Sequence, residues 1–540
     1  MHKFWKSGDP FVWLSGVALM FCLLMIAGLL FLIAAKGLGF FWPSGLAQLD
    51  LKDGTRLMGV ITDHEKVKGY NAGPEAPEIY RTQLKIGNRD LYGLDFKWVD
   101  DDRIENITHP KYAVVLERRE WGNMYGFIKE VSENGNVVCS GNEECWPVLE
   151  AQIPKYHEIY NEIRSIEKGT IGGINMKIED LRIDIRGLQL KGGNNQEKIN
   201  KLEAEVKEQE SKYKEQEAKL SMLYQEFNKE KLVMTSVDGR EKEMPAGTVV
   251  NAYRPNAMSW FQKVSLYLGN AWAFVSEDPR EANTEGGVFP AIFGTIMMVL
   301  LMSIVVLPFG VLAALYLREY AKQGVLVRLV RICVNNLAGV PSIVFGVFAV
   351  GFFIYGMGST IDHIFFKEAL PNPTFGTGGI LWASLTLALL TVPVVIVATE
   401  EGLAAVPKEI RDGSLALGAT KFETTWKIVI PSATPAILTG LILAIARATG
   451  EVAPLMITGV VKLAPQLPVD GYFPYVHLER KFMHLGFHIY DVGFQSPNVE
   501  AAKPMVFTTA LLLILIVVVL NLTAIIVRNR LRKKYTTSAV

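Results

Sequence analysis

Six long apolar runs constrain this chain of 540 residues more than any other feature of its sequence. The first run, residues 11–35, carries no charge and is longer than the apolar core of a signal peptide, so it predicts an uncleaved membrane anchor. A helix of about 20 apolar residues crosses a bilayer with all its backbone polar groups satisfied. We therefore predict an all-α polytopic membrane protein with six transmembrane helices. The other five runs are residues 288–317, 333–355, 376–399, 433–460 and 504–527.

The charges beside these runs predict the orientation of the chain. Cytoplasmic flanks of membrane spans are enriched in Lys and Arg, and Lys3 and Lys6 precede the first run while a basic cluster follows the last. Because six spans return the chain to its starting side, we expect both termini in the cytoplasm. The loop 400–432 and the tail 531–540 then lie in the cytoplasm, and residues 36–287 lie outside it. The basic cluster consists of Arg528, Arg530, Arg532, Lys533 and Lys534.

Residues 36–287 form an insertion between the first and second spans. Asp53-Gly54 and Asn134-Gly135 each separate two short stretches typical of strands, which predicts β-hairpins. We expect residues 46–150 and 233–252 to form a β-rich domain. Cys139 and Cys145 are candidates for a disulfide if this region lies outside the cytoplasm, where thiols are oxidised; no histidine lies near them to suggest zinc.

The middle of the insertion, residues 156–232, has a different pattern. Apolar and uncharged residues recur at spacings of three and four on two stripes, separated by a turn at residues 191–195 and interrupted near residues 169–173. This predicts a long antiparallel helical hairpin, with an intermolecular coiled coil as the alternative. Its role is either a contact arm or a solvated spacer. The second stripe is Ile199, Leu202, Val206, Gln209, Tyr213, Gln216, Leu220, Leu223 and Phe227.

Residues 258–275 carry five aromatic side chains and few charges, which predicts a helix in the membrane interface. The whole chain has a formal net charge of zero, so no basic character points to nucleic acid, and membrane lipid is the expected surroundings. We also find no Gly-rich phosphate loop of the GKS or GKT type. The chain is therefore expected to bind no ATP in that manner, to hold no cofactor of its own and to take its energy from a partner.

The charged segment 400–432, between the fourth and fifth spans, predicts two short helices, 405–417 and 421–430, with a hinge at Gly418. It resembles the coupling loop of ABC-transporter permeases. In that pattern an acidic residue and two small residues are followed by a glycine and then by an apolar-proline pair. Gly-Ser here replaces the usual Ala-Ala. The matching residues are Asp412, Gly413, Ser414, Gly418, Ile428 and Pro431.

Four further blocks, residues 287–295, 307–320, 337–346 and 446–455, resemble the PstA family of phosphate ABC-importer permeases in order and spacing. The resemblance covers about residues 285–530 and implies a type I importer permease core over 288–530 in a bacterial inner membrane. It also implies a second permease of the PstC type, two copies of a PstB-type ATPase and a PstS-type phosphate-binding protein. The insertion lies outside the resemblance, which says nothing of its role.

Arg447 and Glu451 are the only charges in the fifth apolar run. Four residues apart, they are expected on one helix face near mid-membrane, where a charge costs at least about 2.5–3.5 kcal/mol unless it faces the protein interior or the pathway. Either they form a self-neutralising pair that holds helices together, or Arg447 contacts the anion in transit while Glu451 holds the arginine. The second hypothesis is favoured because a planar guanidinium donates two hydrogen bonds to an oxyanion.

The remaining candidates are weaker. Gly339, Pro341 and Gly346 are expected to soften the third run and allow close packing, as structural or gating positions with Pro454. His484 and His488 have the i, i+4 spacing of a metal pair, but no carboxylates complete a site, so no metal is expected. Rival functions are a permease for sulfate or molybdate, and a membrane-anchored assembly or signalling protein that works through the hairpin. No nucleophile–base–acid set supports an enzyme.

Overall fold

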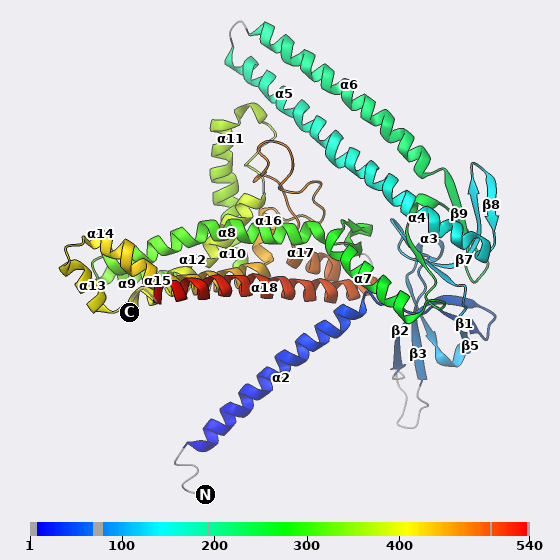
Figure 1. Ribbon diagram of the computed structural model, residues 1–540, viewed down its shortest axis with the longest axis horizontal. Coiled ribbons are helices and arrows are strands. Elements are labelled where there is room, and N and C mark those ends of the chain that lie inside the picture. The colour runs from blue at the N-terminus through cyan, green and yellow to red at the C-terminus, as the bar shows by residue number, and fades with distance from the viewer. Residues whose placement is uncertain (1–7, 68–78, 193–194, 497–498, 537–540) are drawn as a thin grey trace.

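Figure 1 shows the computed structural model, which describes residues 8–67, 79–192, 195–496 and 499–536. Among these residues, six helical segments are long and apolar enough to cross a membrane, which confirms the predicted number. They are α2 (Asp9–Gly39), α8 with a π-helical end (Phe289–Tyr320), α10 to α11 (Ser342–Phe365), α12 (Ile380–Ala404), α14 to α15 (Lys421–Gly450) and α18 (Val499–Thr536). In Figure 1, α8, α12, α15 and α18 run side by side, whereas α2 leaves the bundle at an angle.

Helix α12 is the centre of the bundle. In its most apolar window 67% of the residues are buried, against 0% for α2 and for α18. Small residues let its neighbours approach closely. A Cβ added to Gly310 of α8 would lie 2.6 Å from Val395, and one added to Gly440 of α15 would lie 2.6 Å from the methyl group of Ala398. Helices α8 and α15 both pack against α12, so most of its apolar side chains are buried.

The third span begins later than the sequence suggested. The expected run, 333–355, includes Cys333, but this residue lies in a separate helix, α9 (Val325–Leu337). The span starts after Pro341, whose extended backbone (φ −54°, ψ 134°) precedes α10 (Ser342–Ala349). Proline restricts the residue before it to extended conformations, so Val340-Pro341 separates two helices that hydropathy alone joins.

Helix α2 contacts the bundle at its C-terminal end. The hydroxyl group of Thr508 in α18 donates a hydrogen bond of 3.0 Å to the carbonyl oxygen of Gly37. A Cβ on Gly37 would lie 3.0 Å from the carbonyl oxygen of Phe507, so the absence of a side chain helps the two helices to approach closely. Lys3 and Lys6, on which part of the orientation rests, lie outside the described residues.

The described part of the insertion contains two large antiparallel sheets and, near its end, a two-stranded one. Strands β1 (Ala47–Leu51), β2 (Arg56–Val67), β3 (Ile79–Lys85), β4 (Phe96–Asp100) and β5 (Ile104–Thr108) form one sheet in the order β4-β3-β2-β1-β5. The second has the order β10-β9-β7-β6-β11, with β8 on β7. Its strands are β6 (Val114–Arg118), β7 (Met124–Glu133), β8 (Asn136–Ser140), β9 (Glu230–Thr235), β10 (Glu241–Pro245) and β11 (Val249–Tyr253).

Both hairpins expected from the turn residues are present. Strands β1 and β2 pair around Asp53-Gly54, and β7 and β8 pair around Asn134-Gly135. The expected strand-rich range 46–150 is too long, however, because α4 (Asn142–Arg164) begins inside it. A disulfide between Cys139 and Cys145 joins β8 to the first turn of this helix, and Cys145 is fully buried.

The helical hairpin projects from the β-strands, and its first arm contacts the permease part at Tyr472 and Glu368 (Figure 1). Its first arm comprises α4, a π-helical segment (Ser165–Ile171) and α5 (Gly172–Lys191), and its second arm is α6 (Gln196–Phe227). The arms pack through Ile178, Leu181 and Val206. The expected interruption at residues 169–173 is a π-helical continuation instead of a break. Gly193 and Asn194 of the expected turn lie outside the described residues.

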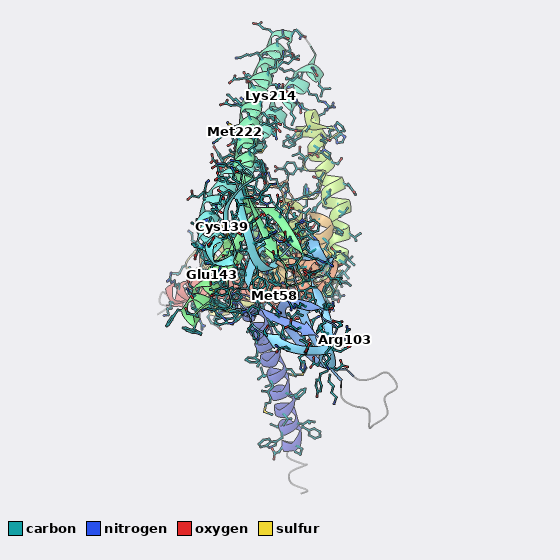
Figure 2. All side chains as sticks on the ribbon, turned by 90° about the vertical axis from the view of Figure 1, so that its right-hand side faces the viewer. Met58, Arg103, Cys139, Glu143, Lys214 and Met222 are labelled. Carbon is teal, nitrogen blue, oxygen red and sulfur yellow. A yellow bond between two sulfur atoms is a disulfide. The ribbon has the colours of Figure 1, made fainter. Side chains whose placement is uncertain are left out.

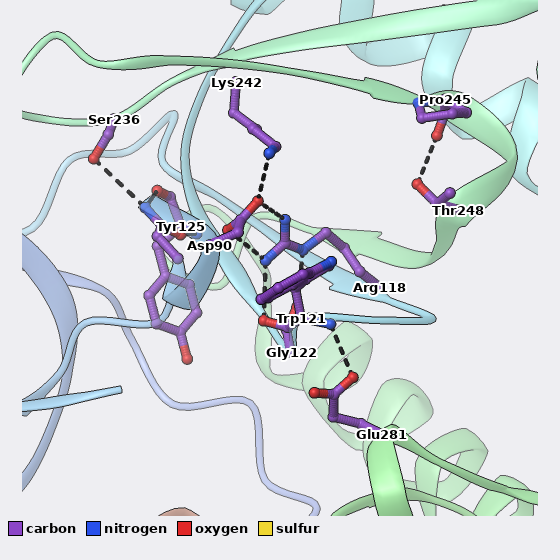
Figure 3. Close-up of polar contacts among 11 residues, drawn as sticks. Asp90, Arg118, Trp121, Gly122, Tyr125, Ser236, Lys242, Pro245, Thr248 and Glu281 are labelled. Atoms are coloured by element: carbon purple, nitrogen blue, oxygen red, sulfur yellow. Dashed lines mark hydrogen bonds and ion pairs between the residues drawn. The ribbon is translucent and has the colours of Figure 1, made fainter. Parts of the chain in front are cut away.

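A short segment before α8 connects three parts of the protein. Strands β12 (Pro279–Arg280) and β13 (Glu285–Gly286) form a small hairpin there. Between them the Glu281 carboxylate accepts a hydrogen bond of 2.9 Å from the Trp121 backbone N–H of the second sheet (Figure 3). Asp278 pairs with Lys168 of the helical hairpin, and the Asn283 amide donates to the Lys462 carbonyl oxygen at 2.8 Å. This segment therefore ties both insertion parts to the bundle.

The second sheet is fixed near that contact by a buried ion pair, drawn in Figure 3. Asp90 of α3 (Arg89–Tyr92) accepts two hydrogen bonds, of 3.0 and 3.1 Å, from the guanidinium of Arg118. Both side chains are 4% exposed. Lys242 contributes a second cation at 3.2 Å from the Asp90 carboxylate. A buried carboxylate requires such partners, and these cations hold the pKa of Asp90 below its usual value although burial alone would raise it.

Candidate functional site

Arg447 and Glu451 meet at the point where α15 (Ile430–Gly450) ends. Arg447 lies in the last helical turn, and Glu451 follows it with an extended backbone (φ −79°, ψ 132°). The two do not share a helix face, as their spacing suggested, because the helix stops between them. Their side chains still approach, with 3.6 Å between the Arg447 Nε and Glu451 Oε1 atoms. The arginine is 32% exposed and the glutamate 20%, so neither charge is sealed inside this chain.

The packing register shows how deep this pair lies. Gly402 contacts Ala436 and Gly440 contacts Ala398, so α12 and α15 run antiparallel. Counting seven residues forward along α15 from Gly440 gives Arg447, and counting seven back along α12 from Ala398 gives Thr391. The two residues therefore lie at about the same depth, close to the middle of Ile380–Ala404. The register supports the expected mid-span position. Helix α15 therefore ends at the depth of the middle of α12, where freed backbone groups need protein or a water-filled path around them.

The chain after this break packs against the third span. Pro454 lies in α16 (Ala453–Thr458), and its Cα would be 2.8 Å from a Cβ added to Gly346. The structure thus brings together two of the four residues proposed as structural or gating positions. Pro341 sets the start of α10, as described above. Gly339 lies in a more open place, with the Asn336 carbonyl oxygen 3.5 Å from its added Cβ.

The loop 400–432, called the coupling loop here for its resemblance to that of ABC permeases, folds around Gly418, whose φ of +88° is a left-handed conformation that glycine adopts without strain. Helix α13 (Lys408–Ala416) precedes it and α14 (Lys421–Thr424) follows. The hydroxyl groups of Ser414 and Thr424 are 2.9 Å apart and buried, which fastens the two helices together. Asp412 and Gly413 lie on the exposed side of α13.

Two boundaries of this loop differ from the expectation. The first helix is shorter than 405–417, because Ala405 ends α12 and the chain turns before Lys408. The second helix is not separate, since Lys421–Gly450 is one continuous span. Pro431 does not break it because it lies in the first turn of α15, directly after a π-helical turn (Thr425–Val429) that contains Ile428. The wider π-turn accommodates a proline that lacks its backbone N–H.

Charged pairs that sequence analysis missed tie the coupling loop to the ends of other spans. The Arg411 guanidinium donates to the Glu319 carboxylate at 2.6 Å, and both side chains are mostly buried. Lys421 donates to the Glu319 backbone carbonyl. Arg331 of α9 lies 3.0 Å from the Glu400 carboxylate of α12. The partners are 69 to 102 residues apart, so no local spacing reveals them, although unpaired charges at span ends were a visible signal.

The exposed part of the coupling loop carries three large apolar side chains. Leu417 is 90% exposed, Phe422 65% and Trp426 59%, and the rings of the two aromatic residues stack with centroids 6.2 Å apart. Exposed apolar side chains gathered on one projecting segment are typical of a surface that another protein covers.

His484 and His488 have the spacing of a metal pair. Both are buried, and the Nδ1 atom of His484 accepts the backbone N–H of Gly486 at 3.1 Å at the start of α17 (Leu485–Tyr490). Burial lowers the pKa of each imidazole to about 4, which favours the neutral form. Within the described ranges, no group of three or more His, Cys, Asp or Glu side chains is arranged to hold a metal ion.

Comparison with known proteins agrees with this arrangement. The model of a family described as binding-protein-dependent transport system inner membrane component matches residues 306–536. The phosphate transport system permease protein PstA 1 of Mycobacterium tuberculosis (strain CDC 1551 / Oshkosh) is 33% identical over 244 residues, covering 45% of this chain and 71% of the relative. The probable phosphate transport system permease protein PstA of Methanocaldococcus jannaschii is 31% identical over 237 residues, covering 43% and 73%.

Two further matches have lower identity. The probable ABC transporter permease protein YqgI of Bacillus subtilis (strain 168) is 28% identical over 273 residues, covering 49% of this chain and 86% of the relative. A crystal structure of the inward-facing methionine ABC transporter MetNI covers 48% of this chain and 97% of its own, at 18% identity and a TM-score of 0.33.

The six apolar spans and the matched region define a multi-pass permease subunit of a membrane transporter. The chain belongs to the binding-protein-dependent transport system inner membrane component family, as a permease of the PstA type.

Proposed function

We propose that this chain is a permease subunit of an ATP-driven phosphate importer in the bacterial inner membrane. The observation that carries this proposal is the identity of 31–33% to PstA permeases over more than two thirds of their length. The coupling loop supports it independently, because its exposed apolar side chains are held to the end of α8 by Arg411 and Lys421, an arrangement suited to receive movement from a partner. The chain itself is a transport subunit, and ATP hydrolysis belongs to that partner.

The pathway residue in this proposal is Arg447. Its guanidinium lies where α15 ends, level with the middle of α12, and its planar fork suits two oxygen atoms of a phosphate ion. Glu451, 3.6 Å away, orients the arginine when the pathway is empty. An anion entering this place would compete with Glu451 for the guanidinium, and this competition keeps binding weak enough for release.

The coupling loop is the proposed contact with a PstB-type ATPase dimer. Leu417, Phe422 and Trp426 would enter a groove of the ATPase, and the Arg411–Glu319 pair would pass movement of the loop to α8. A PstC-type permease would complete the pathway, and a PstS-type protein would deliver phosphate. Rigid helices joined by such contacts move as levers when one end is displaced.

The proposed topology places both termini and the coupling loop in the cytoplasm and the insertion outside. The basic end of α18, which includes Arg528 and Arg530, supports this orientation. The disulfide between Cys139 and Cys145 supports it too, because disulfides persist in oxidising compartments.

Co-purification from native membranes, combined with uptake of labelled phosphate, tests the proposed function. We expect a second permease and an ATPase to accompany this chain, and excess unlabelled phosphate, but not sulfate or molybdate, to suppress uptake. Suppression by sulfate or molybdate instead would reassign the substrate. Isolation of the chain without an ATPase would contradict the transport proposal.

A further inference from the structure

We propose that α7 (Trp260–Ser276) lies in the lipid headgroup region, at the end of the bundle opposite the coupling loop, with its exposed apolar face against phospholipid. The helix would anchor the insertion to the membrane surface. This inference concerns a surface that phosphate transport does not require, so it stands apart from the proposed function.

The exposed face of α7 is apolar and carries no charge. Phe261 is 77% exposed, Leu268 62% and Trp272 71%. Their spacing of seven and four residues places them on one side of the helix. The small residues Ser265 and Gly269 lie beside them and are exposed too, while the single charged residue between positions 259 and 276, Lys263, lies on the other side and is half-buried.

The opposite face fixes the depth of the helix. Phe41, two residues after α2, packs edge-on against Tyr267 and Phe274 with ring centroids 6.0 and 5.4 Å apart. Directly before α8, the Val288 backbone N–H donates to the Phe274 carbonyl oxygen at 2.8 Å. Helix α7 is therefore held at the ends of two apolar spans, where Figure 1 shows it running obliquely between the bundle and the β-strands.

Phospholipid fits this position better than a protein partner. The three helices meet at Phe40–Phe41 and Val288, so α7 lies at the ends of two helices that are long and apolar enough to cross a membrane. Tryptophan is favoured at the boundary between water and hydrocarbon, and Trp260 and Trp272 stand at the two ends of the helix. A helix of 17 residues is too short to span a membrane but long enough to lie in its surface.

Spin labelling of the full chain with its co-purifying partners tests this placement. Cys22 and Cys333 are first changed to serine, which leaves the Cys139–Cys145 disulfide intact. A nitroxide is attached at Ser265→Cys or Leu268→Cys in nanodiscs of phosphatidylethanolamine and phosphatidylglycerol, and its collisions with oxygen and with a nickel chelate are compared. Val519→Cys on α18 serves as the lipid control, and Lys214→Cys on α6, labelled in Figure 2, serves as the water control.

We expect the ratio of oxygen to nickel collisions at both α7 positions to exceed that at Lys214→Cys by about threefold or more, because oxygen concentrates in the apolar layer and the nickel chelate is excluded from it. A ratio equal to that at Lys214→Cys would place the face in water and overturn the proposal. Shielding of both labels from both agents would overturn it too, since a partner protein or a second copy would then cover the face.

Discussion

At the residue scale, two glycines of the coupling loop should respond in opposite ways to replacement by alanine. Gly418 has a φ of +88°, whereas Gly413 lies inside α13 with nothing within 4 Å of an added Cβ. Alanine at Gly418 should cost about 1–2 kcal/mol, because L-residues are strained in the left-handed region. Alanine at Gly413 should stabilise its helix by about 1 kcal/mol.

We predict that Gly418→Ala weakens ATPase binding to the detergent-solubilised complex by about tenfold. The free variant relieves its strain by leaving the left-handed conformation and must regain it to bind, and 1.4 kcal/mol corresponds to that factor. Gly28→Ala, inside α2 with nothing within 4 Å of an added Cβ, is the control and should bind as well as the unmodified chain. Equal binding by both variants would show that the hinge conformation does not contribute to the partner contact.

A second residue-scale prediction concerns Glu117 in the β-rich part. Burial, the largest cause, together with the nearby Glu285 and Glu277 carboxylates, raises the pKa of its carboxyl group from 4.5 to about 7, against the opposing effect of Arg280 and Lys85. The folded protein therefore keeps a proton that the unfolded chain releases between these values. The contribution of this carboxyl group to the free energy of unfolding is fully present below pH 4.5, falls as the pH rises toward 7, and stays reduced above it.

Thermal unfolding of the purified protein at pH 5.5 and pH 8 measures this effect. We predict a lower midpoint at pH 8, and a smaller difference for Glu117→Gln, which is neutral at both values. Glu105→Gln changes an exposed carboxyl in the same region and should leave the difference unaltered. An unchanged difference in Glu117→Gln would assign the pH dependence to other groups.

At the element scale, the contact between the coupling loop and α8 is the connection we expect to transmit movement. Arg411 reaches Glu319 at 2.6 Å, and the side chains are 21% and 11% exposed, so water screens this pair weakly. We predict that Glu319→Gln lowers phosphate uptake several-fold while the ATPase still binds, since removing one buried partner leaves the other charge uncompensated. Glu409→Gln, on the exposed face of α13, is the control. Loss of ATPase binding in Glu319→Gln would instead indicate a purely assembly role.

Element boundaries were only partly predictable from the sequence. Hydropathy predicted six spans because a long uncharged run has few stable structures other than a membrane-spanning helix. Asp53-Gly54 predicted a hairpin because glycine suits the tight turn between two strands. Hydropathy failed at Pro341, where backbone restriction outweighs apolarity, and at Pro431, where a π-turn tolerates the proline. Both misses are backbone effects that residue composition does not record.

At the scale of the whole molecule, the insertion rests on the bundle through contacts that no sequence pattern announced. Gly173, expected to interrupt the helical hairpin, instead makes room for the ring of Tyr472, whose hydroxyl donates to the Gly169 carbonyl oxygen at 2.9 Å. Nearby, Arg480 pairs with Asp470 at 2.6 Å and reaches the Met176 sulfur atom. The Tyr472–Gly169 and Arg480–Met176 contacts each join residues about 300 positions apart. Only the folded chain therefore shows that the hairpin lies on the 459–484 loop.

The sequence identified the candidate pathway residues because two charges in an apolar run are conspicuous. It did not predict how their side chains are arranged. Spacing placed Arg447 and Glu451 on one helix face, whereas the helix ends between them. This difference matters for function. A helix that ends at mid-span exposes an arginine beside freed backbone groups, which is a more open place for an anion than the side of an intact helix.

Uptake of labelled phosphate by proteoliposomes that contain the complete complex with Arg447→Gln tests the central claim most directly. The glutamine keeps much of the side-chain volume but lacks the positive charge and the paired N–H donors of the guanidinium. We predict that uptake falls at least about tenfold, the effect of losing roughly 1.4 kcal/mol from a charge-assisted contact, while the subunits still purify together. Normal uptake by a fully assembled Arg447→Gln complex would contradict the account.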